Sequence, residues 1–531
     1  MTDTGPRRVL GIEGTAWAAS AAAYDVAADR VKIETEAYEP DSGGIHPREA
    51  AEHMADHIPQ VVERAIEAAD GQIDCVAFSR GPGLGPCLRI VATAARAVAQ
   101  RLDVPLVGVN HMVAHLEIGR HQSGFDSPVC LNASGANAHV LGYRNGRYRV
   151  LGETMDTGVG NAIDKFTRHL GWSHPGGPKV EAAAKDGEYI DLPYVVKGMD
   201  FSFSGIMSAA KQAVDDDHAV ADVCFSLQEN VFAMLSEVSE RALALSGADE
   251  LVLGGGVGQN DRLREMLGEM CAQRGADFFA PEARFLRDNA GMIAVLGAKM
   301  YAAGDTIAIA DSAVDSDFRP DEVPVTWRDS DSETPAEAVR QGAEATVTVT
   351  NGTVVKRRAP RSYRHPTLDD RLRRERTREE ARLISEARRA GVPTPVVRDV
   401  DVRETRLDVQ YVGACDLTAA LTEANVRAVA TRLATLHDAG VVHGDPTTRN
   451  VRVARDHDEI DVFLIDFGLG YYSRHPEDHA MDLHVFAQSL VGTADDADTL
   501  VAAATDAYRD AGDATVLQRL ADIEGRGRYQ S

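Results

Sequence analysis

Lysine and cysteine are scarce in this chain, and long apolar runs are missing. Only eight of its 56 basic residues are lysines, so nearly all positive charge is arginine. The six cysteines form no C-x-x-C pair, which argues against a thiolate zinc site or a disulfide framework and fits a reducing compartment. No stretch reaches the roughly 18 apolar residues that a membrane-spanning helix needs. The sequence therefore predicts a soluble, cytoplasmic protein with no membrane partner.

Negative charge is what the chain has in excess. Its 82 acidic residues against 56 basic ones give a formal net charge of −26. An acidic, lysine-poor surface suits a cytoplasm of very high salt, where the Debye length falls to roughly 3 Å and like charges scarcely repel. The composition favours a halophilic protein over an ordinary acidic one. At 531 residues the chain is also too long for a single core.

A segment rich in Asp, Glu, Ser and Pro divides the sequence. Residues 328–342 are interpreted as an acidic linker between a domain of residues 1–327 and a domain of residues 343–531. In the first domain, a strand, a glycine turn and a helix recur, as in "VAFSRGPGLGPCLRIVATAARAV" and "LVLGGGVGQNDRLREM". This repetition predicts a duplicated α/β unit with a ligand in the cleft between two lobes.

The stretch "NHMVAHLE" indicates a metal site. His111 and His115 are four residues apart, so they share one face of a helix. Such pairs more often decorate a helix surface, but this one follows the apolar strand "VPLVGV", and open α/β sheets keep their sites at strand C-termini. Asp288, in "RDNAGMIA", is the candidate third ligand, although it alternatively only begins a helix. Two histidines and one carboxylate admit Fe²⁺ or Zn²⁺.

Met112 follows His111 where the H-E-x-x-H zinc proteases carry their general-base glutamate. A metal here would therefore lack the group that activates water.

Three glycine-rich turns, at residues 11–15, 134–137 and 254–260, are also candidates to cradle a phosphate or an adenine, since glycine lets backbone N–H groups approach an anion. Each turn alone is more often structural than not.

Eight motifs in this order resemble one known family. They are "GIEGTA", "GPGLGPCLR", "NHMVAHLE", "GNAIDK", "HPGGPKVE", "FSFSGI", "GGGVGQNDRLRE" and "DNAGMIA". Together they closely resemble the tRNA threonylcarbamoyltransferase that is the catalytic subunit of the KEOPS complex, once described as a sialoglycoprotein endopeptidase. The resemblance implies an actin-like, two-lobed ASKHA fold. It also implies transfer of threonylcarbamoyl from threonylcarbamoyl-AMP to N6 of the adenosine beside the anticodon, in tRNAs that read codons beginning with A.

The resemblance assigns roles to particular residues. His111, His115 and Asp288 would hold the metal, which would act as a Lewis acid on the donor. The adenylate would be held by Asn132, Ala133, Ser134, Gly135, Ala136, Asp164, Gly177, Glu181 and Asn260. The family usually reads "YVSGGNT" where this chain has "NASGANA", so Asn132 replaces a tyrosine that can contact the metal and Ala136 replaces a glycine. The Asn132 amide oxygen, or a water, would take the tyrosine's place.

The second domain has a kinase pattern. "VVHGDPTTRNV" and "VFLIDFGLG" are spaced like a kinase catalytic loop and DFG motif. Asp445 would orient or deprotonate a hydroxyl, while Asn450 and Asp466 would hold Mg²⁺. Lys356 would contact ATP phosphates, and Glu380, rather than Glu379, would pair with it.

This domain resembles the small RIO-like atypical serine/threonine kinase of the KEOPS complex, whose pattern reads "HGDLTTSN"; Pro446 and Arg449 depart from it. No G-x-G-x-x-G precedes Lys356 and no A-P-E follows Asp466. ATP hydrolysis that regulates the neighbouring domain is therefore favoured over phosphorylation of a docked peptide. The implied partners are tRNA and other KEOPS subunits, with a possible oligomer formed through that complex.

Basic residues gather between Lys356 and Arg378, ten of them against three acidic ones. This arginine-rich segment is predicted to bind the tRNA backbone, with a solvated helix face as the alternative. Two rival functions remain open. A metallopeptidase fused to a signalling kinase requires a general base beside His111, and a sugar-kinase-like enzyme requires an acidic base in the cleft but no histidine ligands.

Overall fold

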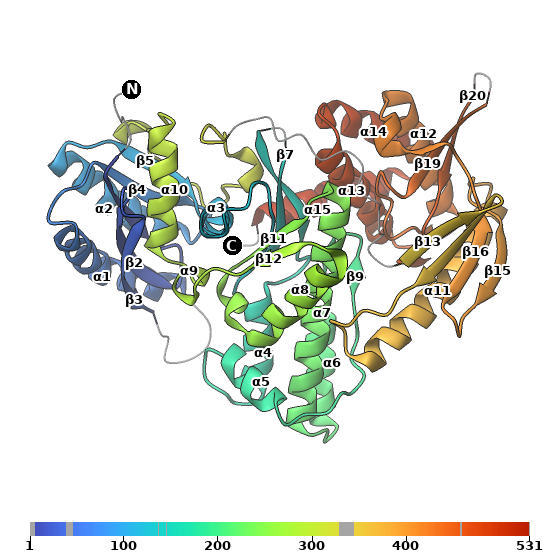
Figure 1. Ribbon diagram of the computed structural model, residues 1–531, viewed down its shortest axis with the longest axis horizontal. Helices are drawn as coiled ribbons and strands as arrows, with labels where there is room; N and C mark the ends of the chain where they lie inside the picture. Colours follow the sequence, from blue (N-terminus) through green and yellow to red (C-terminus); the bar gives the residue numbers. More distant parts are fainter. Residues whose placement is uncertain are drawn as a thin grey trace.

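The computed structural model describes residues 6–38, 46–135, 137–144, 146–328, 345–456 and 459–529. Two α/β lobes are followed by a smaller α+β half (Figure 1). The predicted fold class, an actin-like domain followed by a kinase-like one, is confirmed. Ala136 lies outside the described residues. Residues 329–342, which are most of the expected linker, also lie outside them. Within the described part, no helix is both long and apolar enough to cross a membrane.

The first lobe is built on a five-stranded sheet with the order β3-β2-β1-β4-β5. The first three strands form an antiparallel meander, and β1, β4 and β5 run parallel. Side chains alternate along β1: Leu10 and Ile12 pack with α1 and α2, whereas Val9 packs with α3 and α10 on the other face. The elements are β1 (Arg8–Glu13), β2 (Ala18–Asp25), β3 (Arg30–Ala37), α1 (Pro47–Ala68), β4 (Cys75–Gly81), α2 (Gly85–Leu102), β5 (Leu106–Asn110), α3 (His111–Ser123) and α10 (Ala290–Ala302).

The second lobe repeats this plan. Its sheet has the order β12-β11-β6-β7-β8, with β6, β7 and β8 as an antiparallel meander and β6, β11 and β12 parallel. The duplicated α/β unit expected from the recurring glycine turns is therefore present. The elements are β6 (Val129–Ala133), β7 (Ala138–Arg144), β8 (Arg147–Glu153), α4 (Val159–His169), α5 (Gly177–Ala184), β9 (Val196–Lys197), β10 (Asp200–Phe201), α6 (Ser204–Asp215), α7 (Val220–Ser246), β11 (Glu250–Gly254), α8 (Asp261–Arg274), β12 (Asp277–Phe279) and α9 (Ala283–Leu286).

The remaining half has a small sheet followed by a mainly helical part, which is the two-part layout of a kinase. The sheet order is β13-β14-β16-β15, and all its neighbours are antiparallel. The elements are β13 (Ala345–Thr350), β14 (Thr353–Arg358), α11 (Pro366–Arg389), β15 (Val397–Asp401), β16 (Arg406–Gln410), β17 (Cys415–Asp416), α12 (Glu423–Asp438), β18 (Val441–Val442), β19 (Val451–Asp456), β20 (Glu459–Leu464), β21 (Tyr471–Tyr472), α13 (Pro476–Thr493), α14 (Ala497–Ala511) and α15 (Ala514–Tyr529).

Helix α7 connects the second lobe to the kinase-like half. It is buried along most of its length even though it carries the charged residues Glu237, Glu240 and Arg241. Partners from the other half neutralise the two carboxylates: Arg364 (2.7 Å) and Arg376 (3.1 Å) at Glu237, and Arg361 (3.0 Å) and the Tyr363 hydroxyl (3.1 Å) at Glu240. Buried charges are tolerated only when paired in this way. We call this set of contacts the α7 seam.

The α7 seam engages several arginines of the segment that was predicted to bind the tRNA backbone. Arg361 and Arg364 are each only 5% exposed, and both guanidinium groups meet carboxylates of α7. Arg371 pairs with Asp191 and donates to the carbonyl of Leu192. A guanidinium that is buried against a carboxylate cannot reach an RNA phosphate, so the prediction is wrong for Arg361 and Arg364; Arg371, whose ion pair lies at the surface, is not buried. Arg374 remains half-exposed beside Asp370.

Candidate metal centre and nucleotide sites

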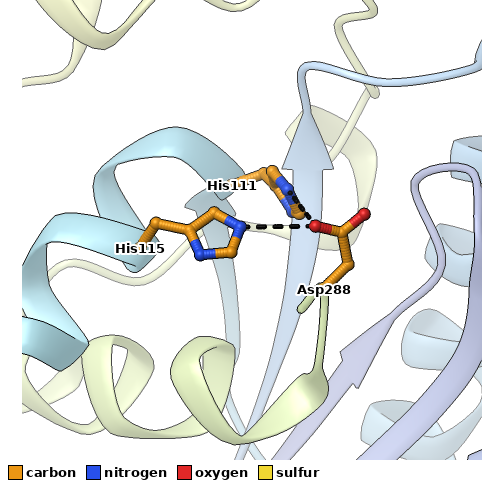
Figure 2. A group of neighbouring side chains, drawn as sticks. All are labelled: His111, His115 and Asp288. Carbon is orange, nitrogen blue, oxygen red and sulfur yellow. Dashed lines mark hydrogen bonds and ion pairs between the residues drawn. The ribbon is translucent and has the colours of Figure 1, made fainter. Parts of the chain in front are cut away.

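His111, His115 and Asp288 converge at the end of β5. Asn110 terminates the strand and caps α3, because its side-chain oxygen accepts the N–H groups of Met112 and Val113. Asp288 comes from the segment between α9 and α10. One of its oxygens lies 3.3 Å from Nε2 of His111 and 3.3 Å from Nε2 of His115 (Figure 2). The three ligand atoms all lie within 4.8 Å of one another, so they can share one cation.

The chemistry of this cluster fits a divalent metal. Two imidazoles and one carboxylate leave further positions open, as a catalytic centre requires. Nδ1 of His115 and the side-chain oxygen of Asn132 are both buried without a hydrogen-bond partner among the described residues. Asn132 itself is fully buried at the end of β6, and its amide nitrogen donates to the sulfur of Met112.

Glu13 completes the cluster, although sequence reasoning did not identify it. Its carboxylate lies 3.2 Å from Nδ1 of His111 and also accepts the N–H of Thr15. A carboxylate on Nδ1 fixes the ring so that Nε2 faces Asp288, which is the usual support for a metal-binding histidine. The available signal was a charged residue directly after the apolar run Val9–Ile12 of strand β1; in the structure Glu13 ends that strand and is fully buried.

The pKa values of His111, His115 and Asp288 depend on one another and on the charge of Glu13. Burial by itself lowers the pKa of His111, but the carboxylates of Glu13 and Asp288 outweigh burial and raise that pKa to about 10. Burial would raise the pKa of Asp288, yet the two imidazoles bring it far below its usual value. Burial lowers the pKa of His115. A cation would therefore enter a site with one ready carboxylate and one neutral imidazole, and it would displace a proton from His111.

A water-activating base is missing from the protease position. Met112 occupies it, and Glu117, the one acidic residue of the stretch "NHMVAHLE", is engaged elsewhere. The Glu117 carboxylate is fully buried and accepts the Tyr148 hydroxyl (2.6 Å) and the Lys299 ammonium (2.9 Å). The metallopeptidase alternative is not supported.

The residues assigned to the adenylate lie on four neighbouring elements of the second lobe. Asn132 and Ala133 end β6, Ser134 and Gly135 form the following turn, Asp164 is on α4, Gly177 and Glu181 are on α5, and Asn260 caps α8. Several already have protein partners. Asp164 accepts the N–H of Gly176 and lies 3.1 Å from His174, and Glu181 accepts the N–H of Asp261.

Two glycines bring the turns of this lobe close together. Gly255 has φ +84°, and a Cβ there would lie 2.2 Å from the Ala133 carbonyl and 2.6 Å from the side-chain oxygen of Asn132. A Cβ at Gly160 would lie 2.7 Å from the Cα of Gly135. Any larger residue would push these turns apart, so the glycines are needed for the approach.

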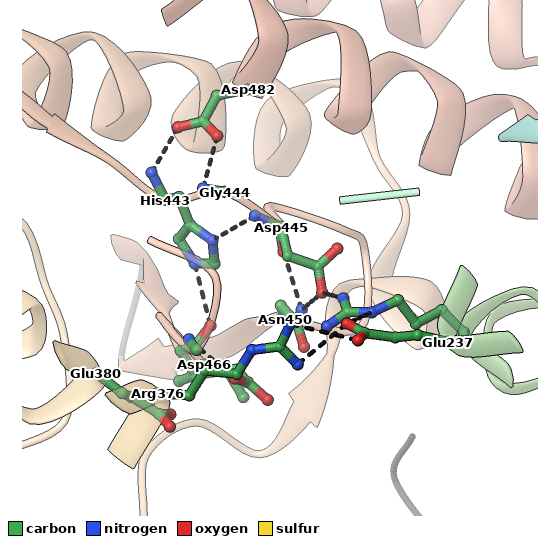
Figure 3. Close-up of polar contacts among 12 residues, drawn as sticks. Glu237, Arg376, Glu380, His443, Gly444, Asp445, Asn450, Asp466 and Asp482 are labelled. Carbon is green, nitrogen blue, oxygen red and sulfur yellow. Dashed lines mark hydrogen bonds and ion pairs between the residues drawn. The ribbon is translucent and has the colours of Figure 1, made fainter. Parts of the chain in front are cut away.

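The kinase-like half brings its assigned residues together. Lys356 on β14 pairs with Glu380 on α11 (2.8 Å) and with Asp466 (2.6 Å), while the Asn450 amide donates to Asp445 (2.9 Å). The carboxylate of Asp482 on α13 fixes the catalytic loop from behind, because it accepts the N–H groups of His443 and Gly444 (Figure 3). Sequence reasoning missed Asp482, which carries no local motif.

Comparisons with known proteins agree with this arrangement. Residues 27–295 match the tRNA N6-adenosine threonylcarbamoyltransferase family, and residues 353–495 match the lipopolysaccharide kinase (Kdo/WaaP) family. A protein of Halobacterium salinarum is 73% identical over 98% of this chain and 99% of its own length. A protein of Haloarcula marismortui is 70% identical over 98% of this chain and 100% of its own length. One of Methanosarcina acetivorans is 46% identical over 98% of this chain and 99% of its own length.

All three relatives are described as probable bifunctional tRNA threonylcarbamoyladenosine biosynthesis proteins. The metal cluster and the paired kinase residues lie within the two matched segments. The chain belongs to the family of bifunctional tRNA threonylcarbamoyladenosine biosynthesis proteins, in which a threonylcarbamoyltransferase is joined to a kinase-like half.

Proposed function

We propose that residues 1–327 transfer threonylcarbamoyl from threonylcarbamoyl-AMP to N6 of the adenosine beside the anticodon, in tRNAs that read codons beginning with A. The observation that carries this proposal is the convergence of His111, His115 and Asp288, with Met112 at the position where the zinc proteases carry their general-base glutamate. Such a site suits an activated donor that is attacked by an amine and disfavours attack by water.

The reaction needs one bond formed and one broken. The N6 amine attacks the carbamoyl carbon of the donor, a C–N bond forms, and the bond from that carbon to the phosphate oxygen breaks. AMP leaves as an already stabilised phosphate, and the surplus proton of the amine passes to it. His111, His115 and Asp288 would hold an Fe²⁺ or Zn²⁺, which would supply Lewis acidity toward the donor.

The protein's own groups position the donor. Backbone N–H groups of the turn that contains Ser134 and Gly135 approach its phosphate, and the carboxylates of Asp164 and Glu181 bind ribose hydroxyls. Gly177 and Asn260 complete this set with Asn132, Ala133 and Ala136. Glu13 holds His111 through Nδ1, so Glu13 is itself unsuited to deprotonate water. The Asn132 oxygen is proposed as a neutral ligand in place of the family's tyrosine.

The domain of residues 343–531 is proposed to bind Mg-ATP, hydrolyse it and so regulate the transferase. Lys356, held by Glu380, contacts the phosphates, Asn450 and Asp466 hold Mg²⁺, and Asp445 orients the attacking group. The contact between Asp445 and Arg241 of α7 supports communication with the transferase. A cytoplasmic location, the linker at residues 328–342, and association with other KEOPS subunits belong to the same proposal.

The test is transfer to RNA in a defined mixture. The full chain, loaded with Fe²⁺ or Zn²⁺, is incubated with threonylcarbamoyl-AMP, Mg-ATP and unmodified tRNA, and the digested nucleosides are analysed by mass spectrometry. We expect threonylcarbamoyladenosine with the loaded wild type and none with Asp288→Ala. Cleavage of a peptide, or donor consumption without a modified nucleoside, would contradict the proposal.

A further inference from the structure

A groove of about 480 Å³ opens beside the metal cluster. Its walls come from β3, from the residue that precedes β2, and from the segment around α9, and one wall ends at Asp288. Trp17, Lys32, Thr35, Arg284 and Arg287 are among its lining residues. None of the residues assigned to the adenylate lines it. The groove therefore adjoins the reacting centre without belonging to the donor site.

Trp17 and Arg287 form a stacked pair in this groove. The Arg287 guanidinium lies over the indole, 5.1 Å from the ring centroid, and the Arg287 side chain is exposed. Within the described ranges Arg287 has no ion pair, whereas Arg284 donates to Glu282 (2.7 Å) and Lys32 lies 3.6 Å from Glu34. An exposed guanidinium backed by an aromatic ring offers a flat cationic surface on which another ring can stack.

The lining of this groove carries more cations than carboxylates, unlike the chain as a whole, although Glu34 and Glu282 lie beside Lys32 and Arg284. A chain with a net charge of −26 places Lys32, Arg284 and Arg287 together on the rim of one groove. Cations interleaved with an aromatic ring are the usual surface for a single-stranded nucleotide, because the base stacks while the cations meet its phosphates. Stacking is also the contribution that survives high salt, since phosphate contacts lose their counterion-release advantage there.

We propose that the Trp17–Arg287 pair is the platform for the nucleobase of the RNA acceptor. This inference rests on the proposed transferase activity. The acceptor adenine stacks on the pair, its flanking phosphates meet Lys32 and Arg284, and its exocyclic amine is directed toward the centre at Asp288. The donor and the acceptor then approach that centre from different elements, the donor from the second lobe and the acceptor from the β2–β3 edge of the first.

Steady-state transfer kinetics test the platform. With donor saturating, Trp17→Ala and Arg287→Ala should each raise the KM for an anticodon stem-loop RNA by roughly 5- to 150-fold, the range expected for one lost stacking contact. The KM for threonylcarbamoyl-AMP and the bound metal content should stay at wild-type values. Trp17→Phe, which keeps an aromatic face, should recover most of the loss. The matched control is Trp172→Phe, because Trp172 lies outside the groove.

Fluorescence gives a second readout that does not require turnover. Stem-loop RNA should quench the wild type more than the Trp17→Phe variant, which retains Trp172 and Trp327, and removal of the single acceptor base from the RNA should abolish that difference. An unchanged RNA KM in both alanine variants of an active enzyme, a rise in the donor KM instead, or quenching that ignores the missing base would overturn the platform. If the wild type transfers nothing, the proposed function fails, and the quenching experiment still decides whether the groove binds the base.

Discussion

The guanidinium of Arg241 lies 2.8 Å from a carboxylate oxygen of Asp445, although the two residues come from different halves of the chain. Arg241 belongs to α7 of the second lobe, and Asp445 is the catalytic aspartate proposed above for the kinase-like half. The same Asp445 oxygen accepts the Asn450 amide (2.9 Å). A carboxylate held by a cation is a weak base, so the transferase half restrains the group that would act on ATP or on a hydroxyl.

Removal of that cation should release the kinase-like site. We expect Arg241→Met to raise the rate of ATP hydrolysis by about tenfold or more, because a positioned base contributes about 10²–10⁴-fold. The measurement is phosphate release with Mg-ATP. Arg274→Met is the matched control, since Arg274 lies 3.6 Å from Glu240, which is on the same helix α7 as Arg241. Equal rates in Arg241→Met and wild type would refute the restraint.

Histidines of helix α3 should differ sharply in how much their replacement reduces bound metal, because only His111 and His115 lie in the candidate metal cluster. His115→Ala and Asp288→Ala should each reduce bound metal from about one ion per chain to a trace and lower transfer by more than about 100-fold, the upper end of what loss of a mere outer partner costs. His121→Ala is the control, because His121 is on α3 but pairs with Asp29 away from the cluster. Metal content by mass spectrometry checks this. Full metal content in either of the first two variants would contradict the assignment.

Glu13 should make metal binding depend on pH. Since Glu13 and Asp288 raise the pKa of His111 to about 10, the ring is protonated at pH 8 and must lose its proton when a cation binds. Metal binding should therefore release about one proton per ion at pH 8, and affinity should increase with pH. Glu13→Gln should release markedly less, which titration in a weak buffer with an indicator dye measures. Equal release by both proteins would show that Glu13 does not control His111.

Asp200 should make the protein less stable as pH increases. Burial raises its pKa to about 8, and His484 of α13 lies 3.7 Å away across the contact between the halves. Between pH 4 and 8 the folded protein keeps this proton while the unfolded chain has released it, so the free energy of unfolding decreases with rising pH. Burial lowers the pKa of His484 to about 4. His484 therefore makes the free energy of unfolding increase with pH only up to about 6.5, and above that pH it does not oppose the effect of Asp200.

The free energy of unfolding should consequently fall by at most about 2 kcal/mol from pH 6.5 to 8 through Asp200. Asp200→Asn keeps the shape and the acceptor for the Glu153 N–H but cannot ionise. Its chemical-denaturation curves at the two pH values should differ less than those of the wild type. A decrease of the same size in both proteins would assign the pH effect to other groups.

Local patterns in the sequence singled out candidate metal-ligating residues and candidate kinase residues that the structure brings together, but not the residues that support them. His111 and His115 follow from helical spacing, and Asp445 and Asp466 from their separation along the chain. Glu13 could not be predicted as a partner of His111 because they are 98 positions apart and meet only through the pairing of β1, β4 and β5. Periodicity shows which face of an element is buried and does not identify what covers it.

The partners of the arginine-rich segment could not be predicted from the sequence either. Its charge invited an RNA partner, whereas the matching carboxylates are on α7, more than 100 residues earlier. Glu237 and Glu240 gave no hint of this, because acidic residues are abundant throughout the chain.

Tyr363 is fully buried in the same apolar cluster as Phe232 and Leu235 of α7, even though it follows the acidic segment in the sequence. We therefore expect hydrophobic packing and the α7 seam to hold the two halves together without a covalent link between them. A protease cut between residues 329 and 344 should leave a nicked protein that still migrates as one particle, and two separately translated polypeptides with these surfaces should assemble without being joined.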